Sequence, residues 1–392
     1  MSTGAPEATD CLLGVYRPAD PLFVAGEGSW LIAEGGRRFL DFTSGIAVNA
    51  LGYGDPDFAT AIEQALDTGL VHTSNLFRTA PAAELAAWLV EHSFADRVFF
   101  CNSGAEAAEG AFKFARRWAR ANGGAEKHEI VAFAGSFHGR TFGALAATDR
   151  PAYREPFEPL LPGVRFAEVG EEEAVADAIS RARTAAVVIE PIQGEGGVQP
   201  VPAGFLATLR ELCDRACAAL IFDEVQTGLG RTGELWAYER AGVVPDLLTI
   251  AKPLAGGLPM GAVLLSERIA GAVQPGDHAS TFGGGPLVAS VALAVCRRIA
   301  DPAFLQRVRR RGEVLARELE RIERHHSVVD IRGIGLIWGI EVTTPAGDIV
   351  ERARDAGVLL CTAGPNVIRL LPPLTVAEAD ITTAVRALEA CL

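Results

Sequence analysis

Short apolar runs alternate with helical patterns through the middle of the chain. The runs are RVFF (97–100), EIVAFAG (129–135), AAVVIEP (185–191), ALIFDE (219–224), DLLTIAK (246–252) and GAVLL (261–265). Helical patterns occupy 105–121 and 205–218 between them. Nearly continuous apolar strands separated by helices predict a mostly parallel sheet that helices cover on both faces. Ligands of such sheets bind outside the carboxyl ends of the strands, so the chemistry is expected there.

The pattern changes after about residue 290. Apolar residues at Phe304, Val308, Leu315, Leu319 and Ile322 predict a long amphipathic helix. Strands are expected within 335–342, 357–362 and 366–371. A closing helix is expected to begin near Thr375, because Thr375 and Glu378 have the spacing of a capping box.

These patterns predict an α/β protein in three segments. Residues 51–290 form a large domain with the mostly parallel sheet, and residues 291–392 form a smaller α+β domain. Residues 1–50, with the hairpin-like stretch WLIAEGGRRFLDF, are expected to pack on the smaller domain.

Composition narrows the classes of partner. The 392 residues include 36 Lys+Arg and 49 Asp+Glu, a formal net charge of −13, which argues against nucleic acid and anionic membrane surfaces. No apolar run approaches 18 residues and the start resembles no signal peptide. Seven scattered cysteines without a CxxC pattern are typical of reduced thiols. We therefore expect a soluble protein of the cytoplasm, with no metal.

The first chemical motif is CNSGAEAAE (101–109), at a strand-to-helix junction. Ser103 and Glu106 have capping-box spacing, which is a purely structural interpretation. The alternative is functional, because the free N–H groups of a helix N-terminus can bind a phosphate. The motif alone does not decide between them.

Further polar residues follow the predicted strands. Asp223 and Lys252 each end an apolar run, and IEPIQGEGG places Glu190 and Glu195 beside a strand end. A lysine at a buried strand end is rare unless it is paired or used covalently. GSFHGRT (135–141) sets Phe137 between glycines, where its ring can stack on a flat ligand or simply pack in a turn.

Together these parts predict a site for pyridoxal phosphate. This cofactor requires a lysine for an imine, an acid for the pyridinium nitrogen, and contacts for its ring and phosphate. Released by an incoming amine, the lysine is also a base at the reacting carbon.

The ordered motifs NSGAEA, SFHGRT, EPIQGEGG, IFDEVQTGLGRTG, AK and STFGG resemble those of the class III, fold-type I pyridoxal phosphate aminotransferases. The resemblance covers nearly the whole chain and is strongest to the acetylornithine aminotransferases of arginine biosynthesis. It implies transfer of the δ-amino group of N2-acetylornithine to 2-oxoglutarate, which gives the N-acetylglutamate semialdehyde and glutamate.

The resemblance also implies roles at the cofactor. Lys252 attaches it and moves the proton, Asp223 holds the ring nitrogen, and Gln226 reaches the phenolic oxygen. The remaining residues implied to contact the cofactor are Ser103, Gly104 and Ala105 at the phosphate, Phe137 and Val225 on the ring, and Thr281 at the phosphate of a neighbouring subunit. A homodimer with shared active sites follows from the last of these.

For the substrates, the resemblance implies two arginines. Arg369 binds the α-carboxylate of glutamate, and Glu195 neutralises it when the ω-amine donor is bound. Arg140 binds the distal carboxylate of either substrate, as a planar guanidinium suits. Ser280 is expected near the substrate.

The chain departs from the family pattern at Pro253, Gly285 and Ala108. The first two bear on loops near the site and so on the choice of substrate. The open alternatives are another ω-amine donor (succinylornithine, ornithine, 4-aminobutyrate or a carrier-linked lysine precursor), an aminomutase of the same fold, and a non-catalytic relative. An intact Lys252 and Asp223 argue against the last, because a scaffold needs neither.

Overall fold

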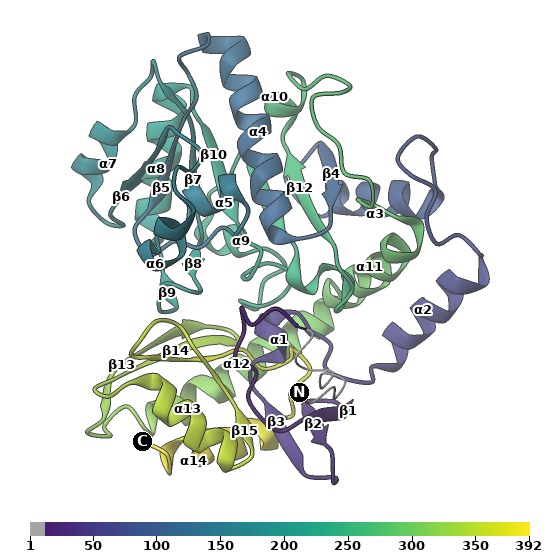
Figure 1. Cartoon of the computed structure of the whole chain (residues 1–392), viewed down its shortest axis with the longest axis vertical. Helices are drawn as coiled ribbons and strands as arrows, with labels where there is room; N and C mark the ends of the chain where they lie inside the picture. The colour runs from purple at the N-terminus through teal and green to yellow at the C-terminus, as the bar shows by residue number, and fades with distance from the viewer. Residues whose placement is uncertain (1–11) are drawn as a thin grey trace, which may run out of the picture.

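The computed structural model describes residues 12–392 (Figure 1). The large sheet and its helices fill the upper part of that view, and two smaller sheets fill the lower part. Within the described residues, no helix is long and apolar enough to cross a membrane. Cys11 lies outside the described residues, and the other six cysteines are free thiols.

The large sheet has seven strands. In spatial order they are β4 (Arg97–Cys101), β12 (Gly261–Leu265), β11 (Leu247–Ile250), β10 (Ala219–Asp223), β7 (Thr184–Ile189), β5 (Glu129–Phe133) and β6 (Val164–Ala167). Only β12 runs against its neighbours, because it pairs antiparallel with both β11 and β4 while the pairs from β11 to β6 are parallel. The prediction of a mostly parallel sheet is confirmed.

Helices cover both faces of this sheet. Ile221 of β10 packs in one apolar cluster with Ala111 and Ala115 of α4, whereas Leu220 and Phe222 face a second cluster that contains α8. This alternation explains why the strands are apolar throughout: successive side chains point to opposite faces and both faces are buried. The helices in and around this region are α2 (Pro56–Asp67), α3 (Ala80–Glu91), α4 (Gly104–Gly123), α5 (Phe142–Ala146), α6 (Pro151–Arg154), α7 (Glu172–Ala178), α8 (Ala203–Ala216), α9 (Ala237–Ala241) and α10 (Glu267–Ala270), with 3₁₀ turns η2 (Glu155–Phe157) and η3 (Lys252–Ala255).

Two four-stranded sheets and a two-stranded ribbon complete the strands. One sheet has the order β13 (Val328–Ile334), β14 (Ile337–Val342), β17 (Val367–Leu370), β16 (Cys361–Thr362). The other has the order β1 (Phe23–Glu27), β2 (Trp30–Ala33), β3 (Arg38–Asp41), β15 (Val358–Leu359), and the ribbon pairs β8 (Ile192–Gln193) with β9 (Gln199–Pro200). The expected hairpin is present as β2 and β3, and β3 pairs in parallel with β15 from the other end of the chain.

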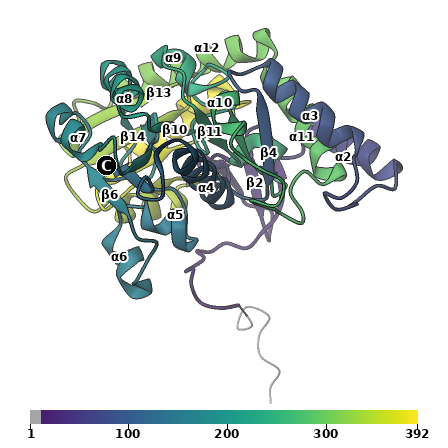
Figure 2. The same ribbon diagram turned by 90° about the horizontal axis from the view of Figure 1, so that it is seen from above.

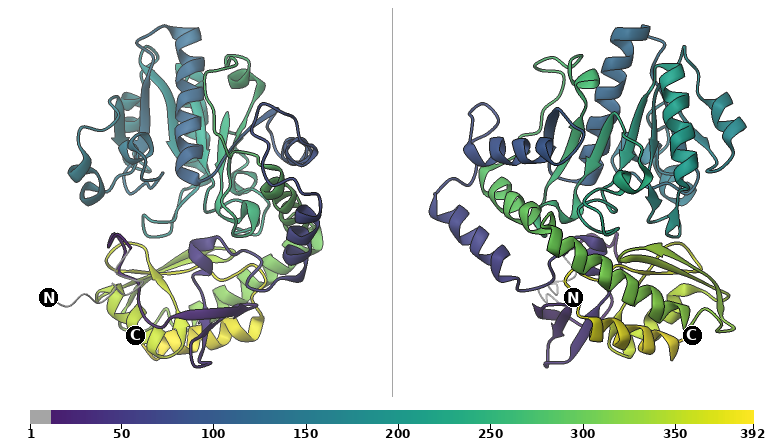
Figure 3. Two further views of the ribbon diagram at one scale, coloured as in Figure 1. Left: turned by 45° about the vertical axis from the view of Figure 1, so that its right-hand side comes forward. Right: turned by 180° about the vertical axis from the view of Figure 1, so that it is seen from behind.

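The remaining helices are α1 (Ser44–Ala47), α11 (Pro286–Ile299), α12 (Pro302–Glu320), α13 (Ala346–Asp355) and α14 (Glu378–Glu389). Figure 3 shows α11 and α12 running one after the other from the large sheet towards the smaller sheets, and α11 also packs against α2 and α3. The expected amphipathic helix is α12, which buries Phe304, Val308, Leu315 and Leu319. The three-segment division of the chain stays a prediction.

The expected capping box at Thr375 is wrong. The last helix begins at Glu378, and its N-cap residue Ala377 has no side chain that could cap it. The Thr375 hydroxyl instead donates a hydrogen bond to the carbonyl oxygen of Leu51, at 3.1 Å. The local sequence pattern predicted that the Thr375 hydroxyl caps the helix, but in the folded chain it bonds to the distant Leu51 instead.

Candidate active site

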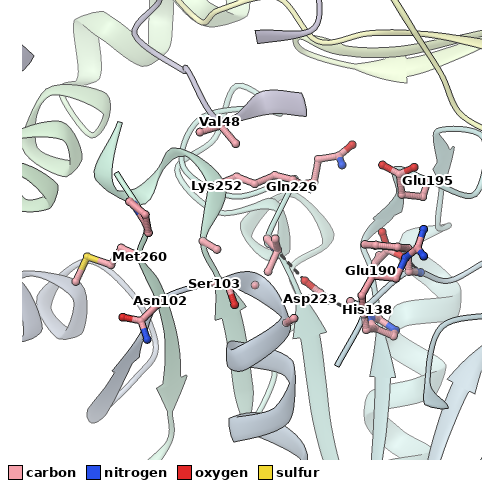
Figure 4. A pocket seen from close by; sticks show the side chains of 18 of the residues that line it. Val48, Asn102, Ser103, His138, Glu190, Glu195, Asp223, Gln226, Lys252 and Met260 are labelled. Atoms are coloured by element: carbon pink, nitrogen blue, oxygen red, sulfur yellow. Dashed lines mark hydrogen bonds and ion pairs between the residues drawn. The ribbon is translucent and has the colours of Figure 1, made fainter. Parts of the chain in front are cut away.

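A cavity of about 410 Å³ opens where the large sheet faces the smaller sheets (Figure 4). It lies at the carboxyl ends of the parallel strands β7, β10 and β11 and at the start of α4, as the topology predicts. Its lining residues are Val48, Asn102, Ser103, Gly104, Ala105, Phe137, His138, Gly139, Arg140, Glu190, Glu195, Asp223, Val225, Gln226, Ala251, Lys252, Gly257, Leu258, Pro259 and Met260.

The start of α4 presents free backbone donors to this cavity. Ser103 is the N-cap, and its hydroxyl accepts a hydrogen bond from the Glu106 amide at 3.2 Å. The Glu106 carboxylate accepts from the amide of Asn102, one residue earlier than a capping box places it, at 2.5 Å. Gly104 and Ala105 are the first two helical residues, so their N–H groups have no partner within the helix. Free N–H groups and the positive end of a 20-residue helix suit an anion.

Asp223 lies at the centre of the cavity floor and is 5% exposed. One carboxylate oxygen accepts a hydrogen bond from Nδ1 of His138 at 2.7 Å, and the other accepts from the amide of Val225 at 3.0 Å. Burial alone lowers the pKa of His138, but the hydrogen bond to Asp223 and its charge outweigh burial and raise that pKa.

Glu190 follows the last residue of β7 and also lines the cavity, near His138 and Asp223. Its two oxygens accept hydrogen bonds from the amides of Phe137, at 2.9 Å, and Gly194, at 3.2 Å. Burial raises the pKa of this carboxyl to about 7, although both amide donors oppose that shift. Glu190 therefore joins the two loops that carry Phe137 and Glu195.

Lys252 follows β11 and is the first residue of η3. Its side chain points into the cavity from the wall opposite His138 (Figure 4). Among residues 12–392 its amine makes no hydrogen bond or ion pair. Burial and then the charge of Arg369 lower its pKa, which favours the neutral, nucleophilic amine.

Three side chains form a network at one side of the cavity. Arg369 of β17 is 1% exposed and donates from Nη1 to Glu195 Oε1 at 2.6 Å and to Gln226 Oε1 at 3.3 Å. Arg369 does not itself line the cavity, but both of its partners do. The smaller sheet thus supplies a cation to a site whose other residues come mainly from the large sheet.

Arg140 lines the cavity and is exposed. Its guanidinium carbon lies 3.4 Å from the ring centroid of Tyr153 and 6.0 Å from that of Phe137. It forms no ion pair within the described part of the chain. Its in-plane N–H groups are therefore available to an acid.

Ser280 and Thr281 do not line the cavity of their own chain. The Ser280 hydroxyl accepts a hydrogen bond from Asn102 Nδ2 at 3.0 Å, one residue removed from the α4 N-terminus. Thr281 is exposed. The cavity thus brings together all the predicted site residues except these two and Arg369.

The cavity fits pyridoxal phosphate. Free amides at α4 match the phosphate, the buried Asp223 carboxylate matches a pyridinium, and the unpaired Lys252 amine matches the aldehyde. The floor also requires a glycine, since a Cβ added at Gly104 lies 2.7 Å from Val225 Cγ1.

The sequence did not identify His138 and Glu190 as site residues, nor Val48, Asn102 and Met260. His138 lies in the motif GSFHGRT (135–141), and a titratable side chain in a motif expected at the ligand indicates a site residue. Its partner Asp223 lies 85 residues away, and only the order of the strands brings the two together.

The sequence of the chain is similar to those of known proteins over nearly its whole length. The family model for class-III aminotransferases matches residues 16–392. The chain is 48% identical to a mitochondrial acetylornithine aminotransferase of Alnus glutinosa, over 97% of this chain and 85% of that protein. It is also 48% identical to acetylornithine aminotransferase 1 of Bradyrhizobium diazoefficiens, over 96% and 93%.

The fold is also similar to that of two solved structures. The N-acetylornithine aminotransferase of Stenotrophomonas maltophilia has a TM-score of 0.84 at 37% identity, with 96% of each chain covered. The ornithine aminotransferase of Toxoplasma gondii has a TM-score of 0.91 at 29% identity, with 97% of this chain and 93% of that chain covered. The expected fold-type I architecture is confirmed by these structures. The chain belongs to the class-III aminotransferases, and pyridoxal 5′-phosphate is its cofactor.

Proposed function

We propose that the protein transfers the δ-amino group of N2-acetylornithine to 2-oxoglutarate, as part of arginine biosynthesis. The observation that carries this proposal is that each carboxylate lining the cavity already has a hydrogen-bond or ion-pair partner. Asp223 is bonded to His138, Glu190 to two amides, and Glu195 to Arg369. The α-ammonium of free ornithine therefore meets no free carboxylate among the described lining residues, whereas a neutral acetamide needs none.

The comparisons support this donor, although two measures differ. By backbone similarity the ornithine aminotransferase of Toxoplasma gondii is nearer, at a TM-score of 0.91 against 0.84. By sequence the acetylornithine enzymes are nearer, at 37–48% identity against 29%. A backbone overlay is insensitive to pocket side chains, which decide specificity, so we give more weight to sequence.

Bound pyridoxal phosphate supplies an aldehyde that accepts the amino group and a ring that stabilises negative charge. The amine of Lys252 attaches the cofactor and moves the proton at the substrate carbon, for which its lowered pKa suits it. Asp223 keeps a proton on the ring nitrogen, and His138 holds that carboxylate in place at 2.7 Å. Phe137 and Val225 would enclose the ring, Gln226 would reach its phenolic oxygen, and the amides of Gly104 and Ala105, with Ser103, would bind the phosphate.

Glu195 and Arg369 select between the two substrates. While the donor is bound, Glu195 occupies the Arg369 guanidinium and the pair is neutral. The α-carboxylate of glutamate or 2-oxoglutarate displaces Glu195 and binds Arg369 in its place. Arg140 binds the carboxylate far from the reacting carbon, and both the donor and 2-oxoglutarate have a carboxylate there.

The proposal includes a homodimer. Thr281 is exposed and outside its own cavity, so it is free to reach the phosphate in a second copy, with Ser280 near the substrate. Large apolar side chains are exposed in the same region, among them Leu76, Phe77 and Phe282 at 86%, 73% and 69%. Figure 2 shows the chain from residue 12 extending away from the body, with Leu12, Leu13 and Tyr16 also exposed. Large apolar side chains that are exposed together are typical of a protein interface.

We place the enzyme in the cytoplasm; the six described cysteines are all free, as is typical of proteins in a reducing compartment. Immunodetection in fractionated cells of the source organism tests this location.

A panel of amino donors with 2-oxoglutarate tests the activity, with glutamate formation as the readout. N2-acetylornithine should give the highest kcat/KM, above ornithine, N-succinylornithine and 4-aminobutyrate. A higher value for another donor would replace the proposed substrate. Product formation without 2-oxoglutarate would indicate an aminomutase instead.

A further inference from the structure

Arg140 is held at the cavity by an aromatic ring. Its guanidinium carbon lies 3.4 Å from the ring centroid of Tyr153, which is closer than any other cation–ring contact among the described residues. Tyr153 belongs to the short helix α6, lies outside the set of cavity-lining residues, and is 37% exposed. No sequence motif pointed to it.

The geometry of this contact suits a carboxylate site. A guanidinium that stacks on a ring uses its flat face, so its N–H donors remain free in the plane. Within residues 12–392 no acid or carbonyl occupies those donors. A free arginine side chain has many rotamers, and ordering it on binding weakens affinity. The ring holds the guanidinium in place before a substrate arrives.

The segment that carries Tyr153 is tied to the loops of the cavity. Asp149 accepts a hydrogen bond from the amide of Gly135, at 2.9 Å, at the start of the loop that bears Arg140. The Arg150 guanidinium donates to the carbonyl oxygen of Glu195, and the Arg150 carbonyl accepts from the amide of Tyr153 at 2.9 Å. These bonds hold the backbone of the segment that carries Tyr153 against both the Arg140 loop and the Glu195 loop.

We infer that Tyr153 is a positioning residue, which pre-orders the Arg140 guanidinium for the distal carboxylate of both substrates. The inference rests on the proposed role of Arg140. It assigns to α6 a part in substrate binding although no atom of Tyr153 lines the cavity.

Steady-state kinetics of the holoenzyme test the inference with three variants. Tyr153→Leu keeps apolar bulk but removes the aromatic face, and should raise KM for N2-acetylornithine and for 2-oxoglutarate by about two- to tenfold with kcat little changed. Tyr153→Phe keeps the face and should retain both wild-type KM values. Phe157→Ala removes a neighbouring aromatic that is 54% exposed and has no cation–ring contact with Arg140, and should also behave as wild type. The absorption of the bound cofactor reports that each variant is folded.

Arg140→Lys separates the inference from the proposed function. If that variant leaves both KM values at the wild-type level, the carboxylate role of Arg140 is overturned. If it raises both but Tyr153→Leu raises neither, only the positioning role is overturned. A fall in kcat without a change in KM for Tyr153→Leu, or equal damage in Tyr153→Phe, also overturns the positioning role.

Discussion

Nδ1 of His138 donates a hydrogen bond of 2.7 Å to the buried carboxylate of Asp223, and this pair forms the floor of the cavity. His138 follows β5 and Asp223 ends β10, and only β7 lies between these two strands in the sheet. Burial lowers the pKa of His138, but the hydrogen bond to Asp223 and the charge of that carboxylate outweigh burial and raise it.

Removing the charge of Asp223 tests the floor of the site. Asp223→Asn should lower kcat in both half-reactions by roughly 10²–10³-fold, because a charge that stabilises the reacting state is lost. His138→Phe should lower kcat less, by about ten- to a hundredfold, since it removes one hydrogen bond to a charged group. Single-turnover absorbance measurements give both values. An Asp223→Asn variant with normal rates would remove Asp223 from the proposed mechanism.

Lys252 makes the stability of the apoenzyme depend on pH in a predictable direction. Its pKa is below the usual 10.5 in the folded state, because burial disfavours the charged amine. At low pH the folded chain therefore bears the full cost of that charge, and the cost disappears as the pH rises to 10.5. Apo Lys252→Met should be more stable than wild-type apoenzyme at pH 7, by a margin that closes towards pH 10.5.

Melting temperatures of the two apoproteins across this range measure the margin. The difference between the variants isolates Lys252 from other groups that titrate. A margin that widens with rising pH has the wrong sign and would contradict a lowered pKa.

Arg369→Ala should affect one half-reaction. KM for 2-oxoglutarate should rise by about ten- to a hundredfold, as expected for a lost hydrogen bond between charged groups. KM for the donor should stay within about twofold, because Glu195 already covers Arg369 when the donor binds. Glu195→Gln is the matched variant and should lower KM for 2-oxoglutarate, since no carboxylate then competes for the arginine. Equal damage to both half-reactions by Arg369→Ala excludes the proposed exchange.

Gly104→Ala should weaken cofactor binding through Val225. The added Cβ lies 2.7 Å from Val225 Cγ1, so the Val225 side chain must shift, and this side chain lines the cavity where the ring is proposed to bind. The dissociation constant for pyridoxal phosphate should rise about tenfold. Val225→Ala in the same chain should recover much of the loss, and Val225→Ala alone supplies the baseline. Absence of recovery in the double variant would assign the effect to the helix instead.

Mixed dimers test whether Thr281 serves the second subunit. Thr281→Ala alone should weaken cofactor binding by about ten- to a hundredfold, the expected effect of losing a hydrogen bond to a phosphate. Lys252→Ala alone should be inactive. A dimer with one subunit of each kind still has one complete site, formed by the intact Lys252 of one chain and the intact Thr281 of the other. It should show about half the wild-type activity at limiting cofactor, provided that Thr281 acts across the interface.

The parts of the site that the sequence predicted are those that depend on local order. Asp223 ends the apolar strand β10, Lys252 follows the apolar strand β11, and Ser103 precedes a helix, so each position follows from the pattern around it. Parallel strands then bring the three residues together, because their carboxyl ends share one edge. The resemblance of the motifs supplied the further roles of Arg140, Glu195, Gln226 and Arg369.

The parts that the sequence missed are contacts between distant segments. The bond between His138 and Asp223 depends on strand order, and the stacking of Arg140 on Tyr153 depends on how α6 folds back. The Thr375 hydroxyl could not be assigned either, since Leu51 competes for it from the other end of the chain. Side chains of this kind have both a local and a distant partner available, and only the folded chain decides between them.

The origin of Arg369 in the last strand has a consequence for biosynthesis on the ribosome. Lys252 and Asp223 leave the ribosome before Arg369, which follows Lys252 by 117 residues (369 − 252). At a translation rate of about 5–20 residues per second, this interval lasts roughly 6–23 s. The half of the site that takes the cofactor is thus synthesised before Arg369, the residue that we propose selects the acceptor. A nascent chain that halts before β17 has Lys252 and Asp223 but lacks Arg369, and so lacks the proposed exchange between Glu195 and the acceptor carboxylate.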